Sequence, residues 1–183
     1  MGKEKTELTK FLVEGLANEL KSKLEKVHFI PPNVEKKFPG HLRKKRIFFD
    51  IWSQKYGKNS SFAVWEIEVR QTWADNNIRK LKEILDWSWE PKIHTFHVFS
   101  PDILKSTKNY CEDEVERLRK KYRNRFLYTP IEIKIPKNRF DKMLEGFKNN
   151  KYSAKRSYGK ELEKEMRRIA NVSVRKLNMM NKS

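Results

Sequence analysis

Three carboxylates stand in a pattern that can bind a divalent cation. Asp50 follows two phenylalanines, and Glu66 and Glu68 alternate with apolar residues further along the chain. Turn-forming residues between these segments predict a hairpin, and a three-residue loop at 57–59 places Asp50 opposite Glu66. Facing side chains lie about 4.5–5.5 Å apart at Cβ, and Glu68 follows on the same strand face. Because clustered like charges are destabilising without a cation, we expect all three to bind Mg²⁺, with Mn²⁺ able to replace it.

The same alternation is also typical of a sheet face that is exposed to solvent. Two features favour a site. The hairpin lies within a succession of strands and helices, whose sheet is normally covered by helices. The rest of the chain is strongly basic, so a local acidic cluster runs against the composition.

A fourth acid is a candidate member of this cluster. Leucines at helical spacing predict a helix over residues 7–26, and a helical wheel places Glu19 in the middle of its apolar stripe. A buried carboxylate is costly unless it is paired or binds a metal. The alternatives are an ion pair with a nearby arginine, or a helix rotation that moves Glu19 to the edge of the stripe.

The remaining metal-binding and nucleophilic residue types offer no competing site. His94 and His97 lie at a spacing that points them to opposite faces of one strand, so they cannot bind one ion together. We expect structural or surface roles for them. Cys111 is the single cysteine, which excludes an intrachain disulfide and a cysteine zinc site.

The order of these acidic motifs resembles the PD-(D/E)xK nuclease superfamily, to which restriction endonucleases belong. The resemblance covers residues 7–100 and rests on the inward Glu19, on Phe48-Phe49-Asp50 and on Trp65-Glu66-Ile67-Glu68. It implies that Asp50 and Glu66 bind Mg²⁺ together with a backbone carbonyl. It also implies catalytic roles for these acids.

The third motif position departs from the family pattern. Glu68 stands where the family usually has a lysine beside the attacking water, so Glu68 would act as a base or bind a second ion. A shifted reading, Glu68-Val69-Arg70, would put Arg70 at that position instead. Hairpin register favours the first reading, because it makes Glu66 the residue that faces Asp50.

The elements that must position these residues follow from hydrophobic periodicity. The pattern predicts strands over 46–54, 62–71, 92–100 and 128–135, and helices over 7–26, 72–86, 109–124, 138–148 and from 159 onward. We therefore expect an α/β fold with a mixed central β-sheet flanked by helices, as in a restriction endonuclease-like core. This core would span residues 1–150. The basic C-terminal helix within 151–183 would pack on the core or on a partner subunit.

The charge of the chain indicates a polyanionic partner. Its 183 residues contain 42 Lys+Arg and 24 Asp+Glu, a net charge of +18. Nucleic acid is the first candidate and an anionic membrane surface the second, and the nuclease resemblance implies double-stranded DNA. Basic and polar residues flank the acidic hairpin and are candidate DNA contacts, although an isolated charge run is equally typical of a solvated surface: Arg43, Lys44, Lys45, Arg46, Arg70, Gln71, Arg79 and Lys80. No apolar run approaches the ~18 residues of a membrane span, so we expect a cytoplasmic protein that does not use a membrane.

Together these features predict a Mg²⁺-dependent DNA endonuclease of the type II restriction kind. One site per chain requires two chains for a double-strand cut, either as a homodimer or as a cleavage subunit beside a larger specificity subunit. A non-catalytic basic nucleic-acid-binding protein is the main alternative. A structure-specific repair or recombination nuclease is the other.

Overall fold

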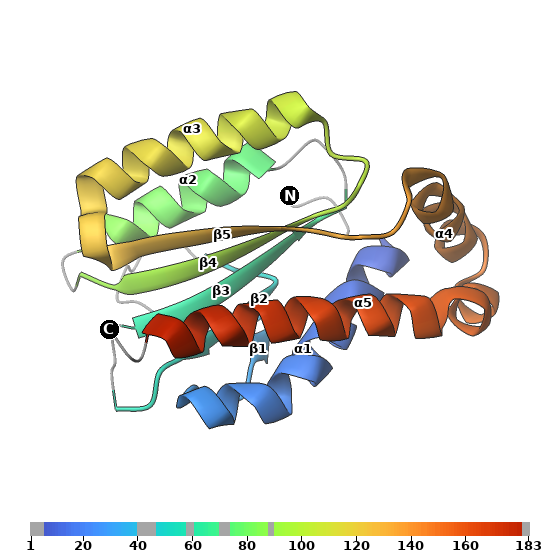
Figure 1. Ribbon diagram of the computed structural model, residues 1–183, viewed down its shortest axis with the longest axis horizontal. Coiled ribbons are helices and arrows are strands. Elements are labelled where there is room, and N and C mark those ends of the chain that lie inside the picture. The colour runs from blue at the N-terminus through green and yellow to red at the C-terminus, as the bar shows by residue number, and fades with distance from the viewer. Residues whose placement is uncertain (1–5, 40–46, 58–60, 70–73, 88–89, 181–183) are drawn as a thin grey trace.

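A central sheet with helices on both faces forms the frame of the molecule (Figure 1). The computed structural model describes residues 6–39, 47–57, 61–69, 74–87 and 90–180. Five strands lie in the sheet in chain order: β1 (Asn33–Val34), β2 (Ile51–Gln54), β3 (Ser61–Glu68), β4 (Lys92–Phe99) and β5 (Phe126–Glu132). The β1–β2 and β2–β3 pairs are antiparallel, whereas the β3–β4 and β4–β5 pairs are parallel. The expected α/β class with a mixed, helix-flanked sheet is confirmed.

Two helical layers cover the sheet (Figure 1). One face carries α1 (Glu7–Leu24) and α5 (Lys151–Met180), and the other carries α2 (Ala74–Leu85) and α3 (Lys105–Tyr122). A shorter helix, α4 (Lys137–Asn149), precedes α5, and single 3₁₀ turns at Glu25–Val27 and Arg123–Arg125 follow α1 and α3.

Strand alternation divides the core into these two layers. On β3, Trp65 and Ile67 belong to the cluster under α1 and α5, whereas Phe62 and Val64 belong to the cluster under α2 and α3. Glu66 and Glu68 continue the second set, so they project toward α2 and α3. Helices on both faces explain why β3 and β4 consist largely of apolar residues.

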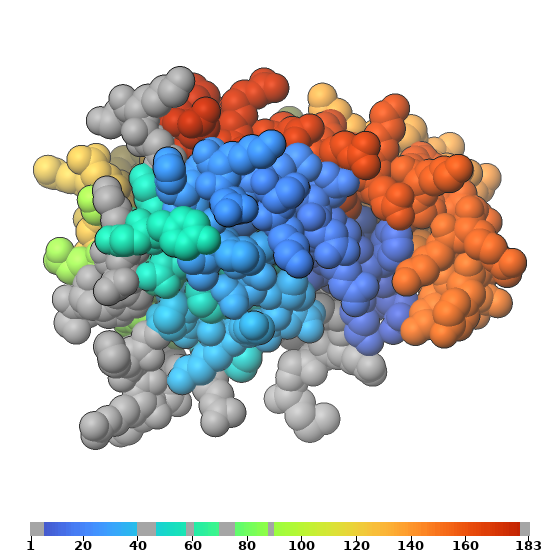
Figure 2. All heavy atoms as spheres, turned by 90° about the horizontal axis from the view of Figure 1, so that it is seen from below, coloured from blue at the N-terminus to red at the C-terminus, as the bar shows by residue number. Residues whose placement is uncertain are grey.

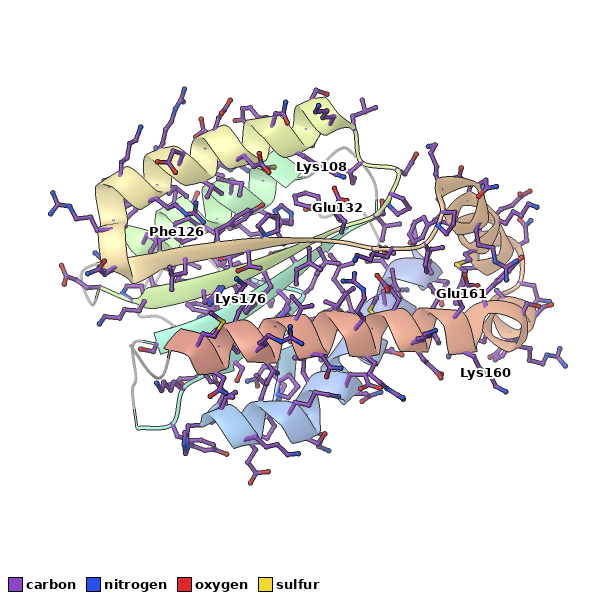
Figure 3. All side chains as sticks on the ribbon, viewed as in Figure 1. Lys108, Phe126, Glu132, Lys160, Glu161 and Lys176 are labelled. Carbon is purple, nitrogen blue, oxygen red and sulfur yellow. The ribbon has the colours of Figure 1, made fainter. Side chains whose placement is uncertain are left out.

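Local sequence signals start the helices. The Thr6 hydroxyl accepts the N–H of Thr9, which caps α1. Pro136 lies directly before α4, at a position where a backbone N–H would have no partner within the helix, so proline costs no hydrogen bond there. Its carbonyl accepts hydrogen bonds from the N–H groups of Arg139 and Phe140. Lys108, in the first turn of α3, pairs with Glu132 at the end of β5 at 2.5 Å (Figure 3).

The elements differ most from the expected ones in four places, one of which is α3, which begins at Lys105 rather than at residue 109. The strand expected from residue 46 enters the ladder only at Ile51, and Phe48 instead forms an isolated bridge with Lys37. The two-residue β1 was not predicted, because two residues are too few to show a period. The last helix begins at Lys151 rather than 159, since no helix-breaking residue separates the two positions.

The C-terminal helix packs on α1 within this chain. Its buried seam, which includes Leu162, Met166 and Ile169, joins the core that α1 forms with the sheet. Figure 2 shows α1 in blue alongside the orange and red spheres of α5. The basic residues of α5 therefore lie on a helix whose apolar side is already covered by the domain.

Candidate functional site

The hairpin register brings Asp50 and Glu66 together. Ile51 pairs with Trp65 in the β2–β3 ladder, so the residues next to them, Asp50 and Glu66, lie opposite each other as expected from the sequence. The Ile67 N–H donates to Asp50 Oδ2 at 2.7 Å, which fixes that carboxylate against β3. Asp50, Glu66 and Glu68 are each no more than 6% exposed. The sheet face that they share is covered, which excludes the solvent-exposed interpretation.

Two side chains from α2 reach down onto these carboxylates. Lys80 Nζ contacts Glu66 Oε1, donates to the Phe48 carbonyl at 3.0 Å and lies 5.2 Å from the centre of the Phe49 ring. Asn77 Nδ2, one turn earlier on the same stripe of α2, contacts Glu68 Oε1. The sequence predicts Lys80 as a DNA contact, whereas the structure places its amine inside the acidic cluster.

The neighbouring strands add a histidine and a tyrosine. His97 of β4 has Nε2 3.4 Å from Glu68 Oε1 and Nδ1 2.9 Å from the Tyr128 hydroxyl of β5. Sequence reasoning placed His97 among structural residues and did not select Tyr128. A signal was present, because His97 lies near the carboxyl end of a strand that pairs in parallel with the Glu66 strand.

The electrostatics of the cluster disfavour a full set of negative charges. Burial raises the pKa of Glu66 to about 8, and the charges of Asp50 and Glu68 act in the same direction. Lys80 opposes them through its charge and its hydrogen bond, but desolvation outweighs it. Glu66 therefore holds a proton near neutral pH unless more positive charge enters the cluster.

Glu19 does not join the other acids. It lies on α1, on the opposite side of the sheet, where it pairs with Lys23 at 2.6 Å and with Arg167 of α5 at 3.1 Å. The hydrogen bond from Lys23 is the main reason that its pKa is lowered. The alternative of an ion pair with an arginine is the one observed, and the expectation of a fourth acid in the cluster is wrong.

The predicted DNA contacts divide into two groups. Arg43, Lys44, Lys45, Arg46, Arg70 and Gln71 lie outside the described residues. Arg79 lines a pocket of about 220 Å³ between α2 and α3, together with Asn76, Lys82, Tyr110 and Glu114. This pocket occupies the stripe of α2 next to the one that carries Asn77 and Lys80.

The two facing carboxylates fit part of a magnesium shell. Within the part of the chain that the structure describes, no three His, Cys, Asp or Glu side chains are arranged to hold an ion by themselves. Mg²⁺ is usually bound through only one or two carboxylates, with water and substrate phosphates as its other ligands. Asp50 and Glu66 supply two such oxygen donors side by side, so their donor chemistry suits Mg²⁺ in the presence of a phosphate.

Comparison with models of protein families, with curated proteins and with solved structures gives no significant match for this chain. Among the described residues, no helix is both long and apolar enough to cross a lipid bilayer. The chemistry of the site is therefore argued from its own geometry.

Proposed function

We propose that this protein is a Mg²⁺-dependent endonuclease for double-stranded DNA, of the PD-(D/E)xK kind that its motifs resemble. The proposal rests on one observation: Asp50 and Glu66 face each other on a covered sheet face, and the amine of Lys80 contacts the Glu66 carboxylate. The mixed sheet flanked by helices supports the proposal, because such a sheet is the frame that the resemblance implies.

Asp50 and Glu66 hold the metal ion in this proposal. An ion held by these two carboxylates would lower the pKa of a water molecule and neutralise charge on the phosphate oxygens. The Ile67 N–H keeps Asp50 oriented for this role. The side chain of Lys80 remains 27% exposed, so the cation that pairs with Glu66 is itself in contact with solvent.

The lysine that the motif usually contains is replaced by two residues in this proposal: Glu68 acts on the attacking water, and Lys80 supplies the positive charge. The water oxygen would bond to phosphorus while one P–O ester bond breaks, and the proton of the water would pass to Glu68. If Glu68 held a second ion instead, that proton would pass to solvent. The leaving oxygen takes a proton from solvent. Lys80 Nζ lies at Glu66 and at the Phe48 carbonyl, where its charge stabilises the negative charge that develops on the phosphate.

The DNA backbone lies against the α2–α3 side of the domain in this proposal. Arg79 and Lys82 of the α2–α3 pocket supply positive charge one helical step away from Lys80. A double-strand cut needs two such sites. The second belongs to another copy of this chain or to a larger specificity subunit.

Plasmid cleavage by matched variants tests the proposal. Purified protein is incubated with supercoiled plasmid in Mg²⁺, in Mn²⁺ and in EDTA. We expect metal-dependent nicking or cutting by the natural chain, and loss to the EDTA level in Asp50→Ala, Asp50→Asn and Glu66→Gln. Glu19→Gln is the control, because it removes the same charge on the opposite side of the sheet and should keep full activity. Full activity of Asp50→Ala contradicts the proposal.

A non-catalytic nucleic-acid-binding protein is the second candidate. One observation favours it: Lys80 already partners Glu66, so the acids can be accommodated as a buried ion-paired cluster without a metal. This candidate predicts salt-sensitive DNA binding with no Mg²⁺-dependent product.

Comparing branched with linear duplex in the plasmid-cleavage conditions separates a structure-specific nuclease from one of the restriction kind.

A further inference from the structure

We infer that His97 and Tyr128 are positioning residues that orient Glu68 through a directed chain of hydrogen bonds, from Tyr128 to His97 to Glu68. The role of Glu68 in cleavage rests on the proposed function. The existence and direction of this Glu68–His97–Tyr128 chain are independent of the proposed function, because they follow from contacts among this protein's own residues.

The chain crosses three adjacent strands inside the core. Glu68 Oε1 of β3 lies 3.4 Å from His97 Nε2 of β4, and His97 Nδ1 lies 2.9 Å from the Tyr128 hydroxyl of β5. His97 is 1% exposed and Tyr128 6% exposed. The His97 ring packs 4.2 Å from the Phe99 ring, centroid to centroid, and meets Tyr128 nearly edge-on. These rings leave the imidazole little freedom to turn away from Glu68.

The chemistry of the groups sets the direction of the chain. An ionised carboxylate only accepts hydrogen bonds, so His97 Nε2 must carry a hydrogen to bond with Glu68. In a neutral imidazole the other nitrogen, Nδ1, is then an acceptor, and Tyr128 must donate to it. Burial raises the pKa of Tyr128, so its hydroxyl keeps the proton that it donates.

The chain acts on a carboxylate that α2 also holds. Asn77 Nδ2 and His97 Nε2 both reach Glu68 Oε1, one from the helix above the sheet and one from the neighbouring strand. Two donors on one oxygen fix the plane of the carboxylate. In the proposed reaction this orientation aims Glu68 at the water or the second ion.

The other histidine on β4 provides a matched control. His94 is 5% exposed, stacks on Phe96 and lies 2.9 Å from the Thr129 hydroxyl, on the opposite sheet face from Glu68. Burial lowers the pKa of His94 to about 4, so it is a neutral, buried histidine. It shares the strand and the burial of His97 without contacting the acidic cluster.

Side-chain ¹⁵N NMR of the metal-free protein tests this chain of hydrogen bonds without any nuclease activity. His97 should be the Nε2–H tautomer, and Tyr128→Phe should shift the Nδ1 resonance of His97 to that of a nitrogen without a hydrogen bond. The His94 resonances, assigned with His94→Gln, should not move. A hydrogen on Nδ1 of His97, or an Nδ1 resonance that ignores Tyr128→Phe, overturns the inference.

Cleavage kinetics test the positioning role. His97→Ala should lower kcat about 10–100-fold with KM for DNA unchanged, the size typical of losing a residue behind a metal-site carboxylate. His97→Gln restores an N–H donor and should recover much of this loss, while His94→Ala should stay within about 2-fold of the natural chain. Equal effects of His94→Ala and His97→Ala, or no recovery in a folded His97→Gln, overturn the role. If the unmodified protein does not cleave DNA, the proposed function fails. The NMR result still shows whether the Glu68–His97–Tyr128 hydrogen bonds exist and in which direction they run.

Discussion

Glu66 is the residue at which burial most strongly disfavours the negative charge that metal binding would require. Its carboxylate is placed next to two others and away from water, and Lys80 is the nearest positive charge. A folded protein stabilised only by packing would be better served by an apolar side chain at this position. Under the proposed function, a cation and a phosphate that bind together would supply the positive and negative charges that complete this cluster.

The raised pKa of Glu66 makes a prediction about stability and pH. The folded state binds a proton up to about pH 8, whereas the unfolded chain releases it near 4.5. Between these values the folded state holds more protons, so the free energy of unfolding in EDTA falls as pH rises. The loss attributable to this group is on the order of a few kcal/mol. Thermal unfolding from pH 5 to 8.5 measures it.

Glu66→Gln is the variant that isolates this effect. It cannot ionise, so its melting temperature should fall less over this pH range than that of the natural chain. Glu19→Gln should keep the natural slope, because the pKa of Glu19 is lowered and Glu19 is already ionised throughout the range. Parallel slopes for Glu66→Gln and the natural chain would show that Glu66 does not titrate in this way.

At the scale of elements, the hairpin was predictable and the helix contacts were not. Alternation on β3 and the turn-forming residue types at 57–59 are local features of the sequence, and together they predict that Asp50 lies opposite Glu66, as the ladder shows. The rotation of α2 that points Asn77 and Lys80 at the acids depends on how its apolar stripe seats on the sheet. His97 reaches Glu68, and Tyr128 reaches His97, only because of the strand order, which the sequence pattern does not specify.

Glu19 shows the limit of a helical wheel. The wheel places it in the stripe that faces inward, and inward here means toward α5 rather than toward the acids. Arg167, almost 150 residues away in the chain, supplies the partner. A periodic pattern identifies which side of a helix is covered, but it does not say which element covers it.

The α1–α5 contact should owe its stability to apolar packing rather than to this ion pair. Met166 is fully buried in the seam, whereas the neighbouring Arg167 side chain is 64% exposed beside Glu19. Met166→Ala should cost about 2–5 kcal/mol of unfolding free energy, and Arg167→Ala less than about 1 kcal/mol. Urea unfolding of both variants measures the difference. Equal costs would mean that the ion pair contributes as much as the apolar seam and would contradict the prediction.

For the whole molecule, the net charge of +18 and the position of the acids together predict which side meets DNA. The acids project toward α2 and α3, so a phosphate that reaches them must lie on that side. The positive charges of α5, including the exposed Lys160, lie on the helix that covers the opposite face (Figure 3). Charge alone would allow DNA to bind either face, whereas the site allows only one.

Salt titration of two single-lysine variants decides between the faces. DNA affinity measured in EDTA should fall steeply with salt, and each lost phosphate contact reduces the log–log slope by about 1. We expect that reduction for Lys82→Ala, in the α2–α3 pocket, and an unchanged slope for Lys160→Ala on α5. Each variant removes one exposed charge, so a general electrostatic effect would lower both slopes alike. A reduction confined to Lys160→Ala would place the DNA across α5, out of reach of Asp50 and Glu66, and would leave a basic binding protein in place of the nuclease.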